Sequence, residues 1–372
     1  MIKVGIECES IEDSETWGIA RQISELLKEL SRRPELASQF KFFLYFKGRV
    51  PDYPYLASRL FEKKVLALPL VPVSFSLYYY LYLPVRLWFD RPAVTYFPNY
   101  MLSLLFTGRS LSTLTEDFYY EMTGRTLSFR YRLAYNIFGR WAARHGTRIM
   151  ALSESSKPAL IKLFGIASSR IAVNPLGINP EARNMKRKTE KCFKLNAPSY
   201  ILYVGQAFPR RHLRETILAF KQILPDFTGL KLVVIGKDKY NPPVIANMLD
   251  ENIIQRDYVS NEELAALYQR AKLCVYVSSH EAFGLPPLEA LGQGTPAVVA
   301  ETPVNRELYG DNAFFVPAPY TPASIAGTLR RGLTDAAKRQ AILAAAPAIV
   351  SRYTWSAHTD RWLEIIRKVA TL

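Results

Sequence analysis

The sequence predicts an α/β protein with two domains, each built on a parallel sheet that helices cover on both faces. Two observations favour this class. Short apolar runs that are typical of strands alternate along the chain with stretches in which apolar residues recur at helical spacing. The 372 residues, 49% hydrophobic and 22% charged, also exceed what one compact core usually holds, and this composition excludes a largely disordered chain.

Seven short apolar runs have the length and composition of strands. They are Met1–Cys8, Phe40–Phe46, Arg148–Leu152, Tyr200–Gly205, Lys231–Gly236, Leu273–Val277 and Pro296–Ala300. Amphipathic helices are predicted between several of them, where apolar residues fall on one helical face: Ile19, Ile23, Leu26, Leu27 and Leu30, and later Leu213, Ile217 and Phe220. No signal-peptide core precedes the first run, so we expect the mature fold to begin at residue 1.

A basic stretch, Met-Lys-Arg-Lys-Thr-Glu-Lys at 185–191, interrupts this alternation. Such a run is most often a solvated linker, although basic runs also serve as localisation signals or nucleic-acid patches. We therefore predict a first domain over 1–183, a linker over 184–199, a second domain over 200–353 and a terminal helix over 354–372. Ligands of open α/β sheets bind beyond the carboxyl ends of the strands, so two facing domains would place the site in the cleft between them.

The positive charge is concentrated in the first half of the chain. The 48 Lys and Arg against 33 Asp and Glu give a net charge of +15, and residues 1–195 hold 29 basic and 17 acidic residues, an excess of 12. Such an excess indicates an anionic partner, a membrane surface or a solubility role. The apolar segment Leu68–Phe89 in this half has one charge, Arg86, but its prolines and tyrosines disfavour a membrane span. We predict that it is core, or a surface that enters a membrane interface.

Three cysteines, Cys8, Cys192 and Cys274, lie far apart in the sequence. Their odd number and the lack of a C-x-x-C pair indicate neither a disulfide framework nor a zinc site. A reducing cytoplasm is therefore the expected compartment.

The densest group of chemically active residues follows the predicted strand Leu273–Val277. It reads S-S-H-E-A-F-G-L-P-P-L-E-A-L-G-Q-G-T-P from residue 278. Gly284 permits a tight turn, and the prolines suit the first positions of a helix whose free N–H groups bind anions. Glu281 lies before this helix and Glu289 about one turn into it. One of these carboxylates could therefore face a sugar while the other accepts hydrogen bonds from hydroxyl groups. The alternative is that Glu289 only stabilises the start of the helix by its charge, which would be the expected role of a glutamate outside such a motif.

A second anion site is predicted after the strand Tyr200–Gly205. Arg210 and Arg211 stand there at the start of an amphipathic helix, where guanidinium groups and the helix dipole would act on one phosphate. Adjacent arginines are otherwise most often solvated surface, and their place at a strand-to-helix junction favours the functional interpretation.

Together these stretches resemble the family-4 glycosyltransferases, retaining enzymes of the GT-B fold that use nucleotide sugars without a metal. Glu281 and Glu289 match the family's E-x7-E motif, and Gly205 and Arg211 match the glycine and lysine of its V-G-R-x-x-x-x-K-G element. Residues 151–157 and 171–178 resemble its S-x-x-S-K and I-x-V-x-P-x-G-V motifs, so the likeness covers most of residues 148–320.

The front of the chain departs from the family pattern. The loop starting at Gly18 resembles the family's first-domain G-x-G-R loop, with Ala20 in place of a glycine. Glu116 and Asp117 stand where many members carry His-Asp, and Gln206 replaces the usual arginine.

The resemblance implies two Rossmann-like domains that face each other across a cleft, with the terminal helix crossing back to the first. It assigns catalytic roles to Glu281, Arg211 and Asp117, and acceptor contacts to Glu116 and Asp117. Donor binding would involve Gly18, Gly205, Arg210, Arg211, His280, Phe283, Gly284, Leu285 and Glu289.

The implied reaction transfers a hexose with retention to a glycan or lipid-linked acceptor, in surface polysaccharide or glycolipid synthesis. Similarity to bacterial mannosyltransferases suggests GDP-mannose as donor, with a UDP-sugar as the alternative, and the resemblance implies no cofactor and no metal. We expect a cytoplasmic protein, peripheral at the inner membrane, whose excess of positive charge meets the anionic membrane surface.

Two other classes of protein share some of these features. A nicotinamide-dependent oxidoreductase also has Rossmann-like domains, but no complete G-x-G-x-x-G follows the strand-like runs. A basic nucleic-acid-binding protein would fit the net charge, but the basic residues form no single stripe and no binding motif is present.

Overall fold

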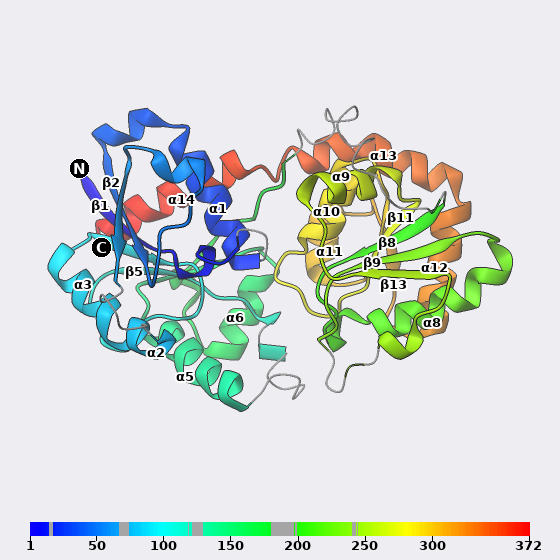
Figure 1. Cartoon of the computed structure of the whole chain (residues 1–372), viewed down its shortest axis with the longest axis horizontal. Helices are drawn as coiled ribbons and strands as arrows, with labels where there is room; N and C mark the ends of the chain where they lie inside the picture. Colours follow the sequence, from blue (N-terminus) through cyan, green and yellow to red (C-terminus); the bar gives the residue numbers. More distant parts are fainter. Residues whose placement is uncertain are drawn as a thin grey trace. The chain divides into compact units, whose positions relative to one another are not determined.

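The computed structural model describes residues 1–14, 18–66, 74–117, 119–120, 129–179, 197, 199–239, 243 and 245–372 (Figure 1). The chain forms two compact units. Residues 1–115, 128–177 and 355–372 make up the first, and residues 116–127 and 178–354 the second. The first unit therefore breaks after residue 177 instead of 183, and residues 116–127 cluster with the second unit. Most of the predicted linker 184–199 lies outside the described residues.

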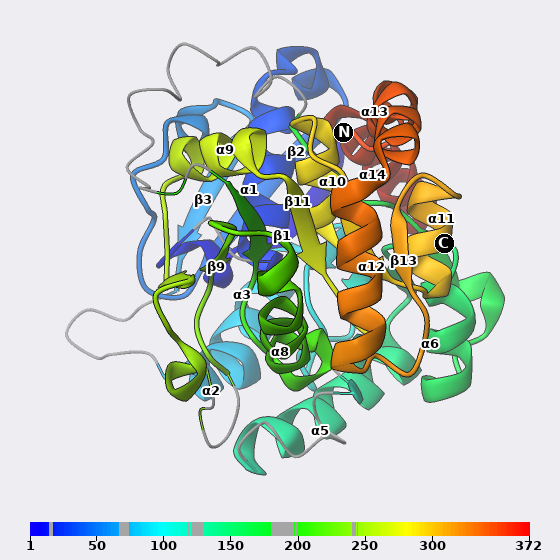
Figure 2. The same ribbon diagram turned by 90° about the vertical axis from the view of Figure 1, so that its right-hand side faces the viewer.

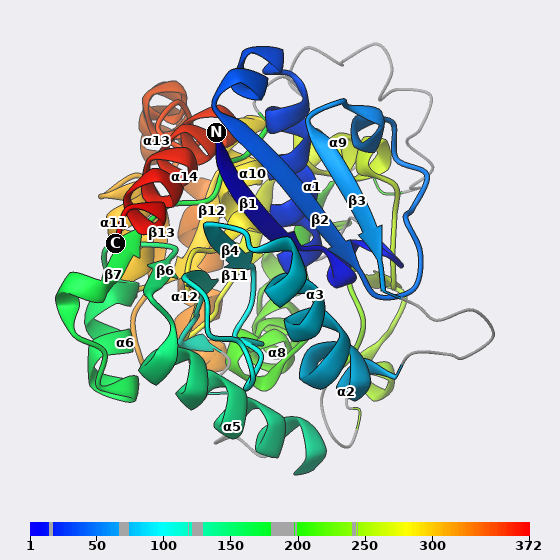
Figure 3. The same cartoon turned by 90° about the vertical axis from the view of Figure 1, so that its left-hand side faces the viewer.

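The first unit contains a seven-stranded parallel sheet in the order β3-β2-β1-β4-β5-β6-β7. Its strands are β1 (Ile2–Glu7), β2 (Phe40–Phe46), β3 (Phe61–Val65), β4 (Val94–Phe97), β5 (Ser110–Thr113), β6 (Arg148–Ala151) and β7 (Ile171–Val173). Its helices are α1 (Gly18–Ser31), α2 (Phe75–Leu77), α3 (Leu83–Asp90), α5 (Phe129–His145), α6 (Ser156–Phe164) and α14 (Trp355–Ala370). Figure 3 shows β1, β2 and β3 side by side.

Alternating side chains of these strands pack against different helices. On one face Phe42 of β2 and Tyr96 of β4 contact Trp362 of α14, with ring centroids 6.4 and 5.5 Å apart. On the other face Phe43 of β2 and Phe97 of β4 belong to a core with α3 and α5. Helices on both faces explain why the strands are apolar at successive positions, as expected for a parallel sheet.

Residues 74–90 contain the described part of the apolar segment Leu68–Phe89. They form α2, one π-helical turn η4 (Tyr78–Tyr82) and α3. Tyr78 and Tyr79 are buried, while Trp88 and Phe89 are exposed. The segment thus contributes both to the core and to the surface, and no helix of the described residues is long and apolar enough to cross a membrane.

The second unit contains a six-stranded parallel sheet in the order β10-β9-β8-β11-β12-β13. Its strands are β8 (Tyr200–Val204), β9 (Lys231–Ile235), β10 (Ile253–Arg256), β11 (Leu273–Tyr276), β12 (Ala297–Ala300) and β13 (Phe314–Val316). Its helices are α8 (Leu213–Ile223), α9 (Asn261–Arg270), α10 (Leu285–Gly292), α11 (Pro303–Tyr309), α12 (Pro322–Thr334) and α13 (Ala336–Val350). Figure 2 shows α8 and α12 side by side over this unit.

The helices of the second unit also divide between two faces of its sheet. Cys274 of β11 packs with Tyr268 of α9 and Ala290 of α10, whereas the preceding residue, Leu273, lies against Gly332 of α12. Helices therefore cover both faces, and the edge at the carboxyl ends of the strands is left for loops. If the six strands are numbered along the chain, their order across the sheet is 3-2-1-4-5-6. This is a doubly wound topology whose switch point lies between β8 and β11.

The structure confirms the α/β class, and all seven predicted strands are present within a residue or two of their predicted ends. The predicted helices over residues 19–30 and 213–220 are α1 and α8. Six strands were not predicted, namely β3, β4, β5, β7, β10 and β13. They are three to five residues long, and β3 has three consecutive charged residues between its apolar ends in Phe-Glu-Lys-Lys-Val. A run this short carries too little periodicity to be distinguished from a loop.

Candidate functional site

The candidate site lies in the second unit, at the switch point between β8 and β11. The loop after β8 contains Gly205 and a 3₁₀ turn, η7 (Pro209–Arg211), and the loop after β11 runs from residue 277 to the start of α10. Both predicted anion sites are thus at one edge of one sheet. The two arginines lie in η7, just ahead of α8, at the strand-to-helix junction where the sequence predicted them.

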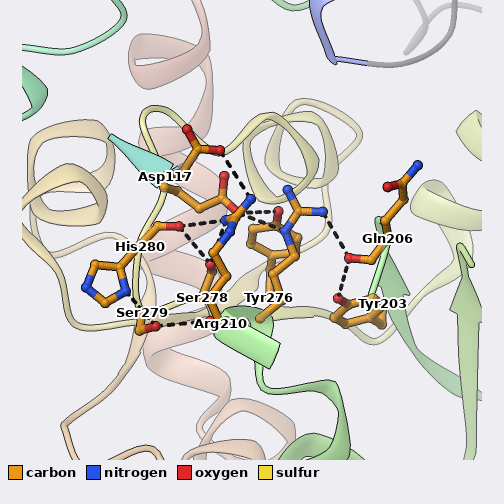
Figure 4. Close-up of polar contacts among 10 residues, drawn as sticks. Asp117, Tyr203, Gln206, Arg210, Tyr276, Ser278, Ser279 and His280 are labelled. Carbon is orange, nitrogen blue, oxygen red and sulfur yellow. Dashed lines mark hydrogen bonds and ion pairs between the residues drawn. The ribbon is translucent and has the colours of Figure 1, made fainter. Parts of the chain in front are cut away.

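Arg210 and Arg211 converge on the carboxylate of Glu281. Figure 4 shows Arg210 close to Asp117, Tyr276 and Ser278. Glu281 Oε1 accepts hydrogen bonds from Arg210 Nη1 at 2.5 Å and from Arg211 Nε at 2.9 Å. The hydroxyls of Tyr276 and Ser278 donate to the same oxygen at 2.8 and 3.2 Å. This cluster joins two motifs that lie about 70 residues apart in the sequence.

The cluster is largely shielded from solvent, with exposed side-chain fractions of 8% for Arg210, 16% for Arg211 and 11% for Glu281. Burial alone would raise the pKa of Glu281, but the charges of Arg210 and Arg211 outweigh burial and lower it to about 2. Burial would likewise lower the pKa of Arg211, yet the charge of Glu281 raises it above its ordinary value. All three groups are therefore ionised throughout the physiological range.

Gly205 allows the loop after β8 to approach Arg211, and Gly236 allows the loop after β9 to approach Gly205. Gly205 has φ of +136°, and a side chain there would place its Cβ 3.2 Å from Arg211 Nη1. Gly236 has φ of +143°, and its Cβ would lie 2.0 Å from the carbonyl oxygen of Gly205. The backbone at Gly205 is thus fixed beside the guanidinium, and the carbonyl of Gln206 accepts from Arg211 Nη1 at 3.0 Å.

Aromatic rings also contact the arginines, and the sequence pattern alone did not reveal them. The guanidinium of Arg211 lies 5.3 Å from the ring centroid of Tyr276 and 5.5 Å from that of Phe208. Tyr203 of β8 lies beside Tyr276, with ring centroids 6.1 Å apart. The sequence does place a tyrosine near the end of β8 and another at the end of β11. These tyrosines point to a shared site only once the two strands are known to be neighbours in the sheet.

Asp117 also contacts Arg210. Its Oδ2 accepts from Arg210 Nη2 at 3.2 Å, and its neighbour Glu116 is buried. Asp117, one of the two predicted acceptor residues, therefore lies against the predicted donor site. His280 accompanies them: its ring stacks on Tyr120 with centroids 3.5 Å apart, and burial together with the charge of Arg210 lowers its pKa.

The remaining donor-site residues of this unit surround the start of α10. Gly284 adopts a left-handed conformation with φ of +94° directly before the helix, and Leu285 is the first helical residue. The side chain of Phe283 is buried against Tyr353, with ring centroids 5.5 Å apart, and so anchors the loop whose backbone is the predicted donor contact. Glu289 accepts from the hydroxyl of Tyr268 at 3.1 Å.

Gly18 is the one predicted site residue in the first unit, where it begins α1 with φ of +32°. The switch point of that unit's sheet lies between β1 and β4, and Glu7 ends β1 there. Glu7 is fully buried and accepts from the hydroxyl of Tyr78 at 3.3 Å. Burial and the charge of Glu9 raise its pKa to about 8, so its carboxyl is mostly protonated at neutral pH.

The described residues contain no group of three or more His, Cys, Asp or Glu side chains that could hold a metal ion. Cys8 and Cys274 are buried and free, and Cys192 lies outside the described residues. The positive charge at the candidate site comes from the two guanidinium groups, whose geometry suits phosphate oxygens.

Comparisons with known proteins identify a matching family and several relatives. Residues 185–348 match the family Glycosyl transferases group 1. The chain is 28% identical over 220 residues to O-antigen chain mannosyltransferase B of Escherichia coli, covering 56% of this chain and 57% of that protein. It is 26% identical over 193 residues to O-antigen chain mannosyltransferase RfbU of Salmonella typhimurium, covering 51% and 52%. The chain thus spans little more than half the length of these relatives.

Solved structures extend the likeness of the fold over the whole chain. WaaG, a glycosyltransferase involved in lipopolysaccharide biosynthesis, has a TM-score of 0.72 at 18% identity, covering 98% of this chain and 99% of that one. Anabaena HepE, solved with UDP and glucose, has a TM-score of 0.73 at 14% identity, covering 99% and 100%. At these identities the likeness concerns the fold.

Proposed function

We propose that this chain, a GT-B protein whose residues 185–348 belong to the glycosyl transferases group 1 family, is a retaining hexosyltransferase that uses a nucleotide sugar. The observation that carries the proposal is the cluster of Arg210, Arg211 and Glu281 at the switch point of the second sheet. Two buried guanidinium groups at this position suit the diphosphate of a nucleotide sugar.

The arginines would act mainly on the leaving group. When the bond between the anomeric carbon and the donor diphosphate breaks, negative charge grows on the phosphate oxygen. Fixed positive charges in a largely buried site stabilise that charge most effectively. The acceptor hydroxyl would form the new bond on the same face of the sugar and pass its proton to the departing phosphate, so the reaction would proceed with retention.

Glu281 would hold the arginines in place and would not take up a proton itself. A pKa of about 2 makes its carboxylate a weak base at neutral pH, because an efficient general base has a pKa near the working pH. This carboxylate contacts both arginines, and so its role at the donor sugar would be electrostatic. Glu289, deeper along α10, remains our candidate for the ribose hydroxyls.

We propose mannose as the sugar and GDP-mannose as the donor, with a UDP-sugar as the alternative. Two relatives are named O-antigen chain mannosyltransferases, which supports mannose, while HepE was solved with UDP and glucose. The acceptor would be a glycan or a lipid-linked glycan of a surface polysaccharide, and Asp117 would help to position its hydroxyl. The family match favours a transferase over a nicotinamide-dependent oxidoreductase or a nucleic-acid-binding protein.

The test is a transfer assay with GDP-mannose and UDP-hexoses on oligosaccharide acceptors, followed by assignment of the anomeric configuration by NMR. We expect transfer with retained configuration, and about a 100-fold loss in Arg211→Ala, since a fixed donor to a developing charge is worth about 3 kcal/mol. Glu289→Ala should lose at least about ten-fold, because hydrogen bonds to charged groups contribute about 1.5–3 kcal/mol.

Glu301→Ala, a substitution of an exposed carboxylate, serves as the control and should transfer at the parent rate. Near-normal rates in both site variants, or a product with inverted configuration, would contradict the proposal.

A further inference from the structure

The first unit carries a concentrated exposed apolar surface. Within the described residues, eighteen large apolar side chains are exposed, and ten of them lie on residues 75–89 and 129–137. They are Phe75, Leu77, Tyr80, Leu81, Val85, Trp88 and Phe89 on the first stretch, and Phe129, Leu133 and Ile137 on the second. Single exposed apolar residues are common, but a cluster of this size marks an interaction site.

The two stretches adjoin in space. The rings of Tyr80 in η4 and Phe138 in α5 lie 5.4 Å apart, and Leu83 and Leu87 share a core with Phe138 and Ala142. The two helical segments thus bury adjoining faces and expose the others, and Figure 3 shows α2, α3 and α5 near one another. We call the ten exposed side chains the apolar surface.

The π-helical turn η4 explains why so many large side chains point outward. A π turn inserts an extra residue into a helix and shifts the side chains that follow it. Tyr78, Tyr79 and Leu83 are buried around this turn, whereas Tyr80 and Leu81 are exposed at 38% and 45%. The exposed Trp88 and Phe89 follow at the end of α3.

The charge beside the apolar surface is positive. Residues 129–145, which form α5, include four arginines and no acidic residue. Arg140 and Arg144 are exposed and continue the helical stripe of Leu133 and Ile137, because the spacings of 4, 3 and 4 residues keep all four on one face. One face of α5 therefore passes from apolar to cationic along its length.

We propose that this surface binds the headgroup region of an anionic lipid bilayer. Tryptophan and other aromatic side chains favour the membrane interface, and arginines beside them attract anionic headgroups. A second copy of the chain fits less well, since an isologous contact would bring the arginine-rich faces of two α5 helices together. The inference goes beyond the proposed transfer reaction and does not depend on it.

The experiment is co-sedimentation with vesicles of phosphatidylglycerol and phosphatidylcholine, or of phosphatidylcholine alone, in low and high salt. We expect binding to the anionic vesicles that high salt weakens. Each arginine near an anionic surface contributes about five-fold to partitioning, so Arg140→Glu with Arg144→Glu should weaken binding at least about 25-fold. Trp88→Ser with Phe89→Ser should weaken binding to a similar extent.

Matched exposed residues provide the controls. Arg32→Glu and Tyr258→Ser change side chains that are likewise exposed but lie outside the apolar surface, and they should bind vesicles as the parent does. Unchanged thermal unfolding would show that the surface variants remain folded, as expected of exposed positions.

The proposal is overturned if the parent does not sediment with anionic vesicles in low salt, or if neither surface variant weakens binding. Sedimentation velocity that shows a dimer lost on Trp88→Ser with Phe89→Ser, without vesicle binding, would also overturn it and assign the surface to a second copy. Binding of single-stranded oligonucleotides in place of vesicles would overturn it in favour of nucleic acid. Nucleotide binding by the second unit is measured separately and should be unaffected by these variants, so failure here leaves the donor-site proposal intact.

Discussion

Glu281→Gln should destabilise the native state by about 3 kcal/mol at pH 7. The substitution keeps the size of the side chain but removes the charge that both Arg210 and Arg211 contact. Folding lowers the pKa of Glu281 from 4.5 to about 2. A tenfold change in the protonation equilibrium corresponds to about 1.4 kcal/mol, which gives the expected loss of about 3 kcal/mol. Because the side chain is only 11% exposed, solvent screening reduces this value little.

The pH dependence follows from the sign of the shift. The folded pKa lies below the unfolded one, so the stabilisation is fully present above about pH 4.5 and is lost as the pH falls towards 2. Urea unfolding of the parent and Glu281→Gln should therefore differ by about 3 kcal/mol at pH 7 and progressively less towards pH 3.

The control is Glu301→Gln, which removes the carboxylate of an exposed ion pair with Arg306. Exposed pairs contribute at most about 1 kcal/mol, so this variant should unfold close to the parent. A difference of less than about 1 kcal/mol between Glu281→Gln and the parent at pH 7 would refute the electrostatic account of the cluster.

Three further predictions concern single residues. Burial of Glu7 raises its pKa in the folded state to about 8. The free energy of unfolding therefore falls as the pH rises above 4.5, the ordinary pKa of the unfolded chain. In urea unfolding, Glu7→Gln should therefore stabilise the native state by about 2.5 kcal/mol more at pH 7 than at pH 5, and a pH-independent effect would contradict this. Asp117→Asn should tighten nucleoside diphosphate binding about five-fold in calorimetry, because the Asp117 carboxylate competes with the diphosphate for Arg210. Transfer should nevertheless slow, and weaker diphosphate binding would argue against this competition. Gly205→Ala should weaken diphosphate binding about ten-fold in the same assay, because its Cβ would press on Arg211 at a φ that disfavours a side chain; parent-like affinity would show that this approach is unimportant.

The sequence predicted the architecture better than the contacts of the site. The strands of both sheets that are long and apolar were found, because periodicity and composition are local properties. The grouping of Gly205, Arg211, Glu281 and Glu289 followed from the order of motifs and from the resemblance. The arginine and glutamate motifs do follow the carboxyl ends of adjacent strands.

The ion pairs within the site could not be predicted in the same way. The sequence suggested that Glu281 faces a sugar, while the structure brings it against Arg210 and Arg211. That contact depends on the pairing of β8 with β11, which joins residues about 70 positions apart. The supporting hydroxyl of Tyr276 was missed for the same reason.

The measurement that tests the central claim most directly is a calorimetric titration of GDP and UDP, without divalent metal, into the parent and Arg211→Gln. We predict that at least one nucleotide binds the parent and that the variant binds it at least about ten-fold more weakly, since a charge-assisted hydrogen bond contributes about 1.5–3 kcal/mol. Arg306→Gln, which removes an exposed arginine, should leave the affinity unchanged. Failure of both nucleotides to bind the parent, or equal affinity in Arg211→Gln, would contradict the assignment of this cluster as the diphosphate site.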